Sequence, residues 1–123
     1  MNYKQFNDKY FLHLEPHEEL IRELKKFCDE KNIKNATISG LGAINSVTLG
    51  FYNTQTQDYT EQSMHKGFEL SSLYGHITTD ESTNELSMHI HATICDKDFR
   101  TYGGHLFRAI VSKTIECVIT VLE

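Results

Sequence analysis

The segment from Glu85 to Cys95 alternates between apolar and polar residues, which is the pattern of a β-strand that buries one of its faces. Residues two positions apart in a strand point to the same side. One side consists of Leu86, Met88, Ile90, Ala92 and Ile94, and the other of Glu85, Ser87, His89, His91, Thr93 and Cys95. The segment therefore predicts a strand with an apolar core face. Its polar face carries His89 and His91 about 6.6 Å apart at their Cα atoms.

The rest of the chain predicts one helix among short strands. Apolar residues recur at helical spacing from His17 to about Lys31, and Pro16 stands where helices begin. We expect strands at 9–14, 36–39, 47–52, 58–63, 68–78, 105–111 and 114–122, a tight turn at Gly40–Ala43 and a possible bulge at Gly75. One helix followed by strands at hairpin spacing indicates an α+β fold with a mainly antiparallel sheet. The length of 123 residues fits a single domain, 1–123.

Composition excludes several classes of protein. Hydrophobic residues make up 39% of the chain and charged residues 24%, which fits neither a disordered nor a membrane protein. The formal net charge of −5 argues against bulk attraction to nucleic acid. Cys28, Cys95 and Cys117 lie far apart and form no C-x-x-C pair, so we expect reduced, buried thiols in a cytoplasmic protein.

A third histidine, His105, can join the pair on the polar strand face. It stands 14 positions after His91, directly after Gly103 and Gly104, and the intervening loop can return the chain antiparallel beside the pair. Three histidines without an obvious fourth protein ligand leave one coordination position open, as in catalytic zinc sites. Imidazole also suits Fe, Ni and Cu, so another divalent metal fits the same pattern.

The alternative interpretation is that these are ordinary surface histidines, since an H-x-H pair on a polar strand face is often no more than that. The other four histidines show no ligand spacing, although His76 could face the same pocket from a neighbouring strand. They are His13, His17, His65 and His76. Cys95 shares the parity of His89 and His91 but is more typical of a buried free thiol.

Several ordered blocks make the sequence resemble the PPC family, the plant-and-prokaryote conserved domain. They are Gly40-Leu41-Gly42-Ala43 with the strand Val47–Tyr52, Phe68-Glu69-Leu70-Ser71-Ser72-Leu73-Tyr74-Gly75, His89-Ile90-His91, Gly103-Gly104-His105-Leu106 and Thr114-Ile115-Glu116-Cys117. The resemblance implies a curved antiparallel sheet and a homotrimer. It also implies a distant kinship with acetolactate decarboxylase, which holds zinc through a similar histidine set. Plant members bind DNA and carry AT-hook segments, whereas this chain has no Arg-Gly-Arg-Pro core.

A reaction at such a metal would need a carboxylate as a proton carrier or to anchor a ligand. Glu69, which lies in one of the family blocks, is the first candidate catalytic residue, and Glu116, on the polar face of its strand, is the second. Both could equally be solvated strand residues. Arg100 and Arg108 are candidate cations for an anionic ligand.

Three functions therefore compete. The first is a metal-binding protein whose open three-histidine zinc site binds or transforms a small molecule. The second is a DNA-associated regulatory module, motivated by the family resemblance. The third is a trimeric scaffold with a structural metal.

Overall fold

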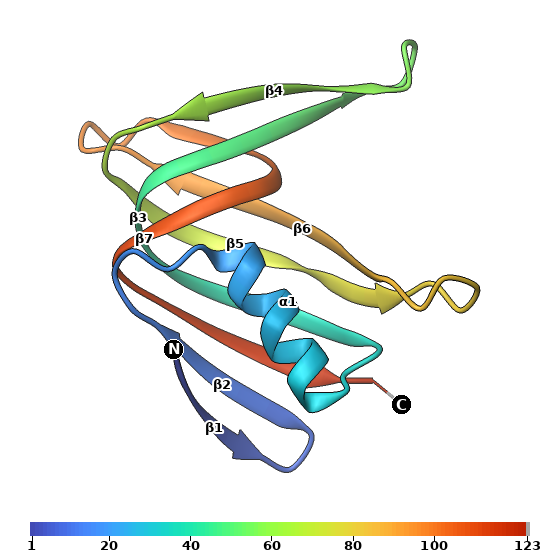
Figure 1. Ribbon diagram of the computed structural model, residues 1–123. Helices are drawn as coiled ribbons and strands as arrows, with labels where there is room; N and C mark the ends of the chain where they lie inside the picture. Colours follow the sequence, from blue (N-terminus) through green and yellow to red (C-terminus); the bar gives the residue numbers. More distant parts are fainter. Residues whose placement is uncertain (123) are drawn as a thin grey trace.

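The computed structural model describes residues 1–122 and contains one helix and seven strands over that range (Figure 1). The elements are β1 (Asn2–Phe6), β2 (Lys9–Leu14), α1 (Leu20–Lys31), β3 (Ala36–Asn53), β4 (Asp58–Met64), β5 (Phe68–Thr79), β6 (Leu86–Cys95) and β7 (Thr101–Val121). The predicted α+β class with a mainly antiparallel sheet and one main helix is confirmed. No helix within residues 1–122 has the length and hydropathy needed to cross a bilayer.

The strands form one sheet in the order β1-β2-β7-β6-β5-β3-β4, and every ladder between them is antiparallel. The long strand β7 also pairs with β3, so the ladders joining β3, β5, β6 and β7 close on one another. This closure curves the sheet, and the β3–β4 hairpin extends beyond it at the top of Figure 1. The curvature places the end of β3 over the outer face of β6, and residues of both strands line one cleft.

Helix α1 covers the sheet with one apolar side. Leu20, Leu24 and Phe27 are buried, and the Phe27 ring meets the Tyr10 ring of β2 edge to face at 5.1 Å. The helix begins at Leu20 because the Glu19 carboxylate accepts the N–H groups of Ile21 and Arg22. The predicted start was therefore too early. His17 has a φ of 76°, which no helical residue adopts.

Strand β3 is continuous, so the predicted tight turn at Gly40–Ala43 is wrong. Gly40 and Gly42 pair with both β5 and β7, and a Cβ on Gly40 would lie 2.6 Å from the carbonyl oxygen of Glu116 in β7. These glycines permit close strand approach rather than a change of direction. The predicted bulge at Gly75 is also wrong, because the shift in the β5–β6 register lies between Leu70 and Ser72.

Two further differences concern the ends of the chain. The strands expected at 105–111 and 114–122 are parts of the single strand β7, which pairs with β6, β3 and β2 along its length. Strand β1 was not predicted, because all five of its residues are exposed and leave no apolar alternation to detect.

Candidate metal centre

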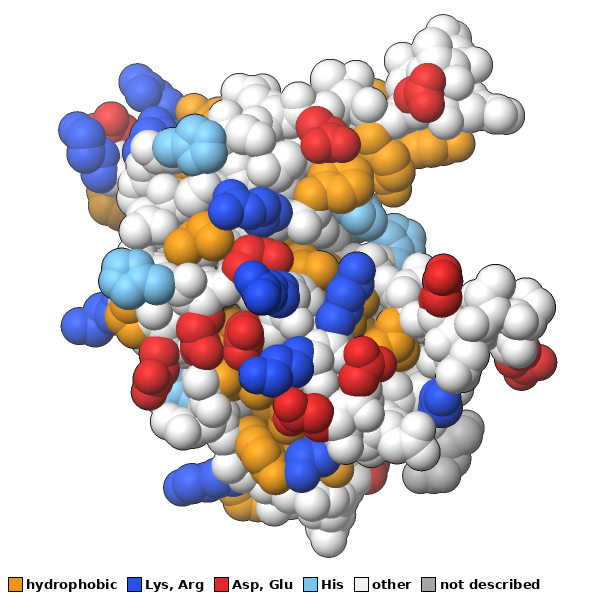
Figure 2. Space-filling model, in the orientation of Figure 1, with side chains coloured by type: hydrophobic (Ala, Val, Ile, Leu, Met, Phe, Trp, Pro, Cys, Tyr) orange, Lys and Arg blue, Asp and Glu red, His pale blue; other side chains and the backbone are white. Residues whose placement is uncertain are grey.

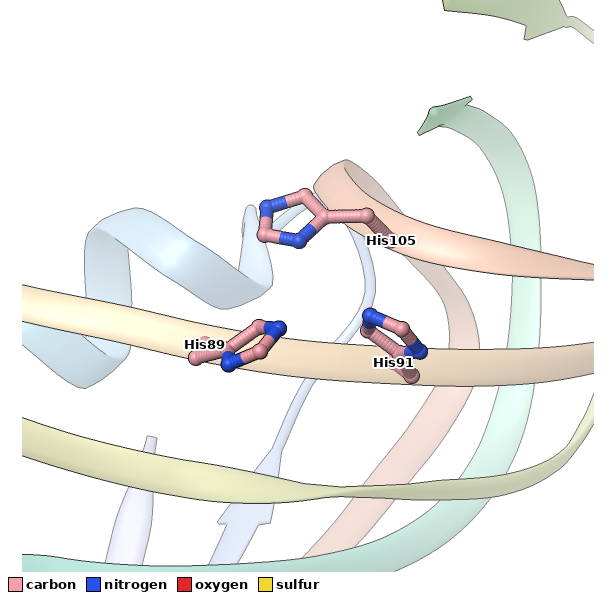
Figure 3. Close-up of side chains that lie close together, drawn as sticks. All are labelled: His89, His91 and His105. Carbon is pink, nitrogen blue, oxygen red and sulfur yellow. The ribbon is translucent and has the colours of Figure 1, made fainter. Parts of the chain in front are cut away.

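His89, His91 and His105 converge on one side of the sheet. His89 and His91 are neighbours on the outer face of β6, and the β6–β7 register places His105 opposite His91. One ligand nitrogen from each ring lies within 4.8 Å of the others. Figure 3 shows a ring nitrogen of His105 directed toward the space between the two β6 histidines. The structure therefore brings the three predicted ligand residues together.

The local geometry follows from alternation along β6. Ile90 and Ala92 are buried, whereas His89 and His91 are exposed on the other face, as the parity of the sequence predicted. Gly104 pairs with Ala92, and a Cβ on it would lie 2.7 Å from the carbonyl oxygen of Gly50. A residue without a side chain at this position lets β7 approach β3 directly beside His105.

The donor set fits a divalent metal. Nδ1 of His105 is buried and has no hydrogen-bond partner within residues 1–122, and a metal ion is one species that would satisfy such an atom. Burial, and after it the neighbouring His89 and His91, lower the pKa of His105, which favours the neutral imidazole that binds metals. Zinc–nitrogen bonds of about 2.0–2.1 Å imply nitrogens about 3.4 Å apart, so modest side-chain rotations reach zinc geometry.

The histidines lie in a cleft of about 470 Å³, a size typical of small-molecule sites. It is visible in Figure 2 as the notch where pale blue histidine lies beneath orange side chains of the β3–β4 hairpin. The residues that line it are Gly50, Phe51, Tyr52, Tyr59, His89, His91, Gly104 and His105. The Tyr59 ring packs against the His105 ring at 5.0 Å. Within residues 1–122, no Asp, Glu, Lys or Arg lines the cleft.

The aromatic residues of this cleft were missed by sequence reasoning. Phe51 and Tyr52 come from β3 and Tyr59 from β4, and all three are exposed. Their partial alternation predicted strands but gave no sign that the hairpin lies over the polar face of β6. That placement depends on the curvature of the sheet.

In the folded chain, the two candidate catalytic carboxylates, Glu69 and Glu116, lie away from the three histidines. Glu69 pairs with Cys95 at the far end of the β5–β6 ladder and lines a different hollow, beside Asp96. Glu116 pairs with His13 of β2 and Leu41 of β3, and it is exposed. Neither residue lines the histidine cleft.

The remaining candidates also lie outside the cluster. The His76 ring is 5.5 Å from that of His89, centre to centre, but its nitrogens do not join the group of three. His65 pairs with the Ser46 hydroxyl at 2.9 Å. Arg108 donates to the same hydroxyl at 3.4 Å, and Arg100 lies 3.8 Å from the Asp98 carboxylate.

Comparisons with known proteins agree with this fold. Over 99% of this chain and 84% of the other, the structure superposes with a TM-score of 0.94 on a "putative DNA-binding protein" from Bacteroides thetaiotaomicron that is 32% identical. A metal-containing protein from Archaeoglobus fulgidus is 29% identical, with a TM-score of 0.87 over 100% of this chain and 86% of that one.

More distant proteins share the fold or a segment. The α-acetolactate decarboxylase of Bacillus subtilis, 12% identical, superposes with a TM-score of 0.62 over 92% of this chain and 52% of its own. At that identity the likeness concerns the fold alone. The chain is also 30% identical over 98 residues to the bifunctional protein GlmU of Synechococcus sp., covering 79% of this chain but only 14% of that protein.

The model of the Plants and Prokaryotes Conserved (PCC) domain matches residues 1–123. This is the family that the blocks around Gly40, Phe68, His89 and Gly103 resemble. The chain belongs to the Plants and Prokaryotes Conserved domain family.

Proposed function

We propose that the protein binds a divalent metal, zinc in the first instance, through His89, His91 and His105, and that the metal presents an open position to a small ligand. The observation that carries the proposal is the convergence of three imidazole nitrogens within 4.8 Å inside a cleft. The metal content stated for the Archaeoglobus fulgidus relative supports it.

Two properties of His105 support metal binding at this site over an ordinary group of surface histidines. The buried Nδ1 of His105 lacks a partner among the described residues, and the lowered pKa of this residue keeps its ring neutral and ready to bind. A bound divalent ion would polarise an oxygen ligand or lower the pKa of a bound water. Because no carboxylate of the described residues lines the cleft, we limit the proposal to ligand binding and include no reaction. The proton-carrier roles expected of Glu69 and Glu116 stay predictions.

The test is the metal content of the purified protein and of single variants. We expect close to one equivalent of metal per chain in the unaltered protein and a large loss in His89→Ala, His91→Ala and His105→Ala. His76→Ala is the matched control, because it removes an exposed histidine beside His89 that lies outside the cluster. Metal-free protein after growth and dialysis with zinc, iron and nickel would overturn the proposal. Anomalous scattering at the zinc edge identifies the ion.

DNA association is the second candidate, and the name of the Bacteroides thetaiotaomicron relative is what favours it. The net charge of −5 opposes it, since affinity for DNA comes largely from Lys and Arg that neutralise phosphates. A binding assay with duplex DNA over a range of salt concentrations tests this candidate. Absence of binding at low salt removes this candidate.

The assembly and compartment complete the proposal. We expect a homotrimer. A chelator tests whether the metal is structural, because removal of a metal that joins subunits would dissociate the trimer. An unchanged mass after chelation supports a ligand-binding site instead. All three cysteines are free thiols, which fits a reducing compartment such as the cytoplasm.

A further inference from the structure

Aromatic side chains beside the three histidines indicate which kind of ligand the cleft would accept. Tyr52 and Tyr59 face each other across the β3–β4 ladder with ring centres 5.1 Å apart, and Tyr59 continues to His105 at 5.0 Å. Phe107 lies behind, 5.1 Å from Tyr59 and 4.5 Å from His105. A continuous row of aromatic rings therefore leads from solvent to the ligand nitrogens.

Gly50 makes this row possible. It pairs with His105 in the β3–β7 ladder, and a Cβ on it would overlap the Phe107 ring and lie 3.1 Å from the Tyr59 ring. The rings lie over a position where the strand has no side chain. This packing holds Tyr59 against His105, while Tyr52 lines the cleft with 45% of its surface exposed.

The charge of a bound metal ion in this cleft favours one class of ligand. Three metal-bound imidazoles would not offset the charge of a divalent ion, and the part of the chain that the structure describes, 1–122, places no carboxylate in the lining. The unmet charge favours an anionic ligand, and carboxylate oxygen is an ordinary ligand of zinc. A flat apolar group on that ligand would meet the faces or edges of the exposed rings.

We propose, on the basis of the metal-binding function above, that the cleft binds an aromatic oxygen acid. Its anionic oxygens face the metal, and its planar ring packs against Tyr52 and Tyr59. Tyr52 is the specificity-determining residue. Its ring is exposed in the cleft and packs against Tyr59 rather than against any of the three histidines. Tyr59 is a positioning residue as well, since it packs on His105.

The test compares two probes with the same chelating group. Benzohydroxamate carries an aromatic ring and acetohydroxamate a methyl group, and their affinities for the zinc-loaded protein are measured by titration calorimetry. We expect benzohydroxamate to bind about tenfold more tightly than acetohydroxamate, from ring packing and added apolar burial. In Tyr52→Ala this preference falls to about twofold or less while acetohydroxamate affinity is retained. Phe6→Ala, which removes an exposed aromatic of β1 that does not line the cleft, keeps the full preference.

The outcomes separate this inference from the proposed function. Equal affinities for the two probes, or an aromatic preference that survives in Tyr52→Ala, overturn the inference and leave metal binding intact. If the protein holds zinc but binds neither probe, the open ligand position and the inference both fail. Absence of zinc itself overturns the proposed function.

Two controls guard against an indirect effect. Zinc content and mass in solution are measured for each variant, and a smaller assembly in Tyr52→Ala would overturn the inference by showing that this ring contacts a second copy. Tyr52→Leu keeps most of the side-chain volume without the aromatic face. It replaces the alanine variant where the latter does not fold, and we expect the same loss of preference.

Discussion

His91 and His105 lie directly opposite each other in the antiparallel ladder between β6 and β7. The sequence separates them by 14 positions, and the chain between them leaves β6, turns at the Asp96 loop and returns as β7. The Asp96 side chain holds this turn by accepting the N–H groups of Asp98 and Arg100. The candidate metal centre therefore spans two strands, and a bound ion would link them.

This linkage predicts that zinc stabilises the folded protein. A ligand that binds only the folded state adds about 2.7 kcal/mol to the free energy of unfolding at one hundred times its dissociation constant. We expect an increase of this order in urea titrations of protein with added zinc. His105→Ala should show no increase, whereas His76→Ala should keep it. A similar increase in His105→Ala would place the zinc elsewhere.

Gly75 in β5 permits the close approach of β5 and β6 at the candidate metal centre. It pairs with Ile90, between the two β6 histidines, and a Cβ on it would overlap the backbone carbonyl of His89. We expect Gly75→Ala to lower the free energy of unfolding by about 1–3 kcal/mol and to weaken zinc binding, because β6 must move. Urea titration and zinc titration measure both effects.

Gly67→Ala is the matched control for this substitution. A Cβ on Gly67 would meet nothing within 4 Å, and its φ is not positive. We expect a change within about 0.5 kcal/mol. Equal losses in the two variants would contradict the role assigned to the close approach of β5 and β6.

The stability of the metal-free protein should depend on His105 at mildly acidic pH. Burial, followed by His89 and His91, lowers the pKa of His105 below its usual 6.5. The unfolded chain then binds this proton at a higher pH than the folded chain does. Stability is therefore complete above about pH 6.5 and falls as the pH drops from there toward the lowered folded pKa.

Urea midpoints between pH 7.5 and pH 5, measured with a chelator present, test this dependence. His105→Gln removes the titrating group, so its midpoint should fall less over the same interval. A wild-type midpoint that falls no more than that of His105→Gln would show that this residue does not titrate differently on folding.

The three cysteines should differ in reactivity toward a thiol reagent such as dithionitrobenzoate. Burial raises the pKa of Cys117 to about 12, and burial together with Asp29 raises that of Cys28 to about 11. Cys95 is only half-buried. We expect one thiol per chain to react quickly in the native protein, three after unfolding, and none quickly in Cys95→Ser. Rapid reaction of Cys28 or Cys117 in the native state would indicate local opening of the core.

The sequence by itself determined the elements whose residues alternate or repeat with a clear period. The parity of residues 85–95 determined which face of β6 is buried and placed His89 and His91 together, because a strand has a strict period of two. The Gly-Gly-His segment predicted correctly that His105 returns to this pair. These inferences rest on local geometry, which needs no knowledge of the rest of the chain.

Tertiary structure decided what glycines and exposed residues do. Gly40 and Gly42 read as a turn in the sequence, yet they lie inside β3 because another strand approaches where a side chain would stand. The separation of Glu69 and Glu116 from the candidate metal centre depends on strand order. The position of Tyr52 and Tyr59 beside the three histidines depends on the curvature of the sheet, which brings the β3–β4 hairpin over β6. Pairing between distant strands sets all of these features, and no local pattern of residues encodes it.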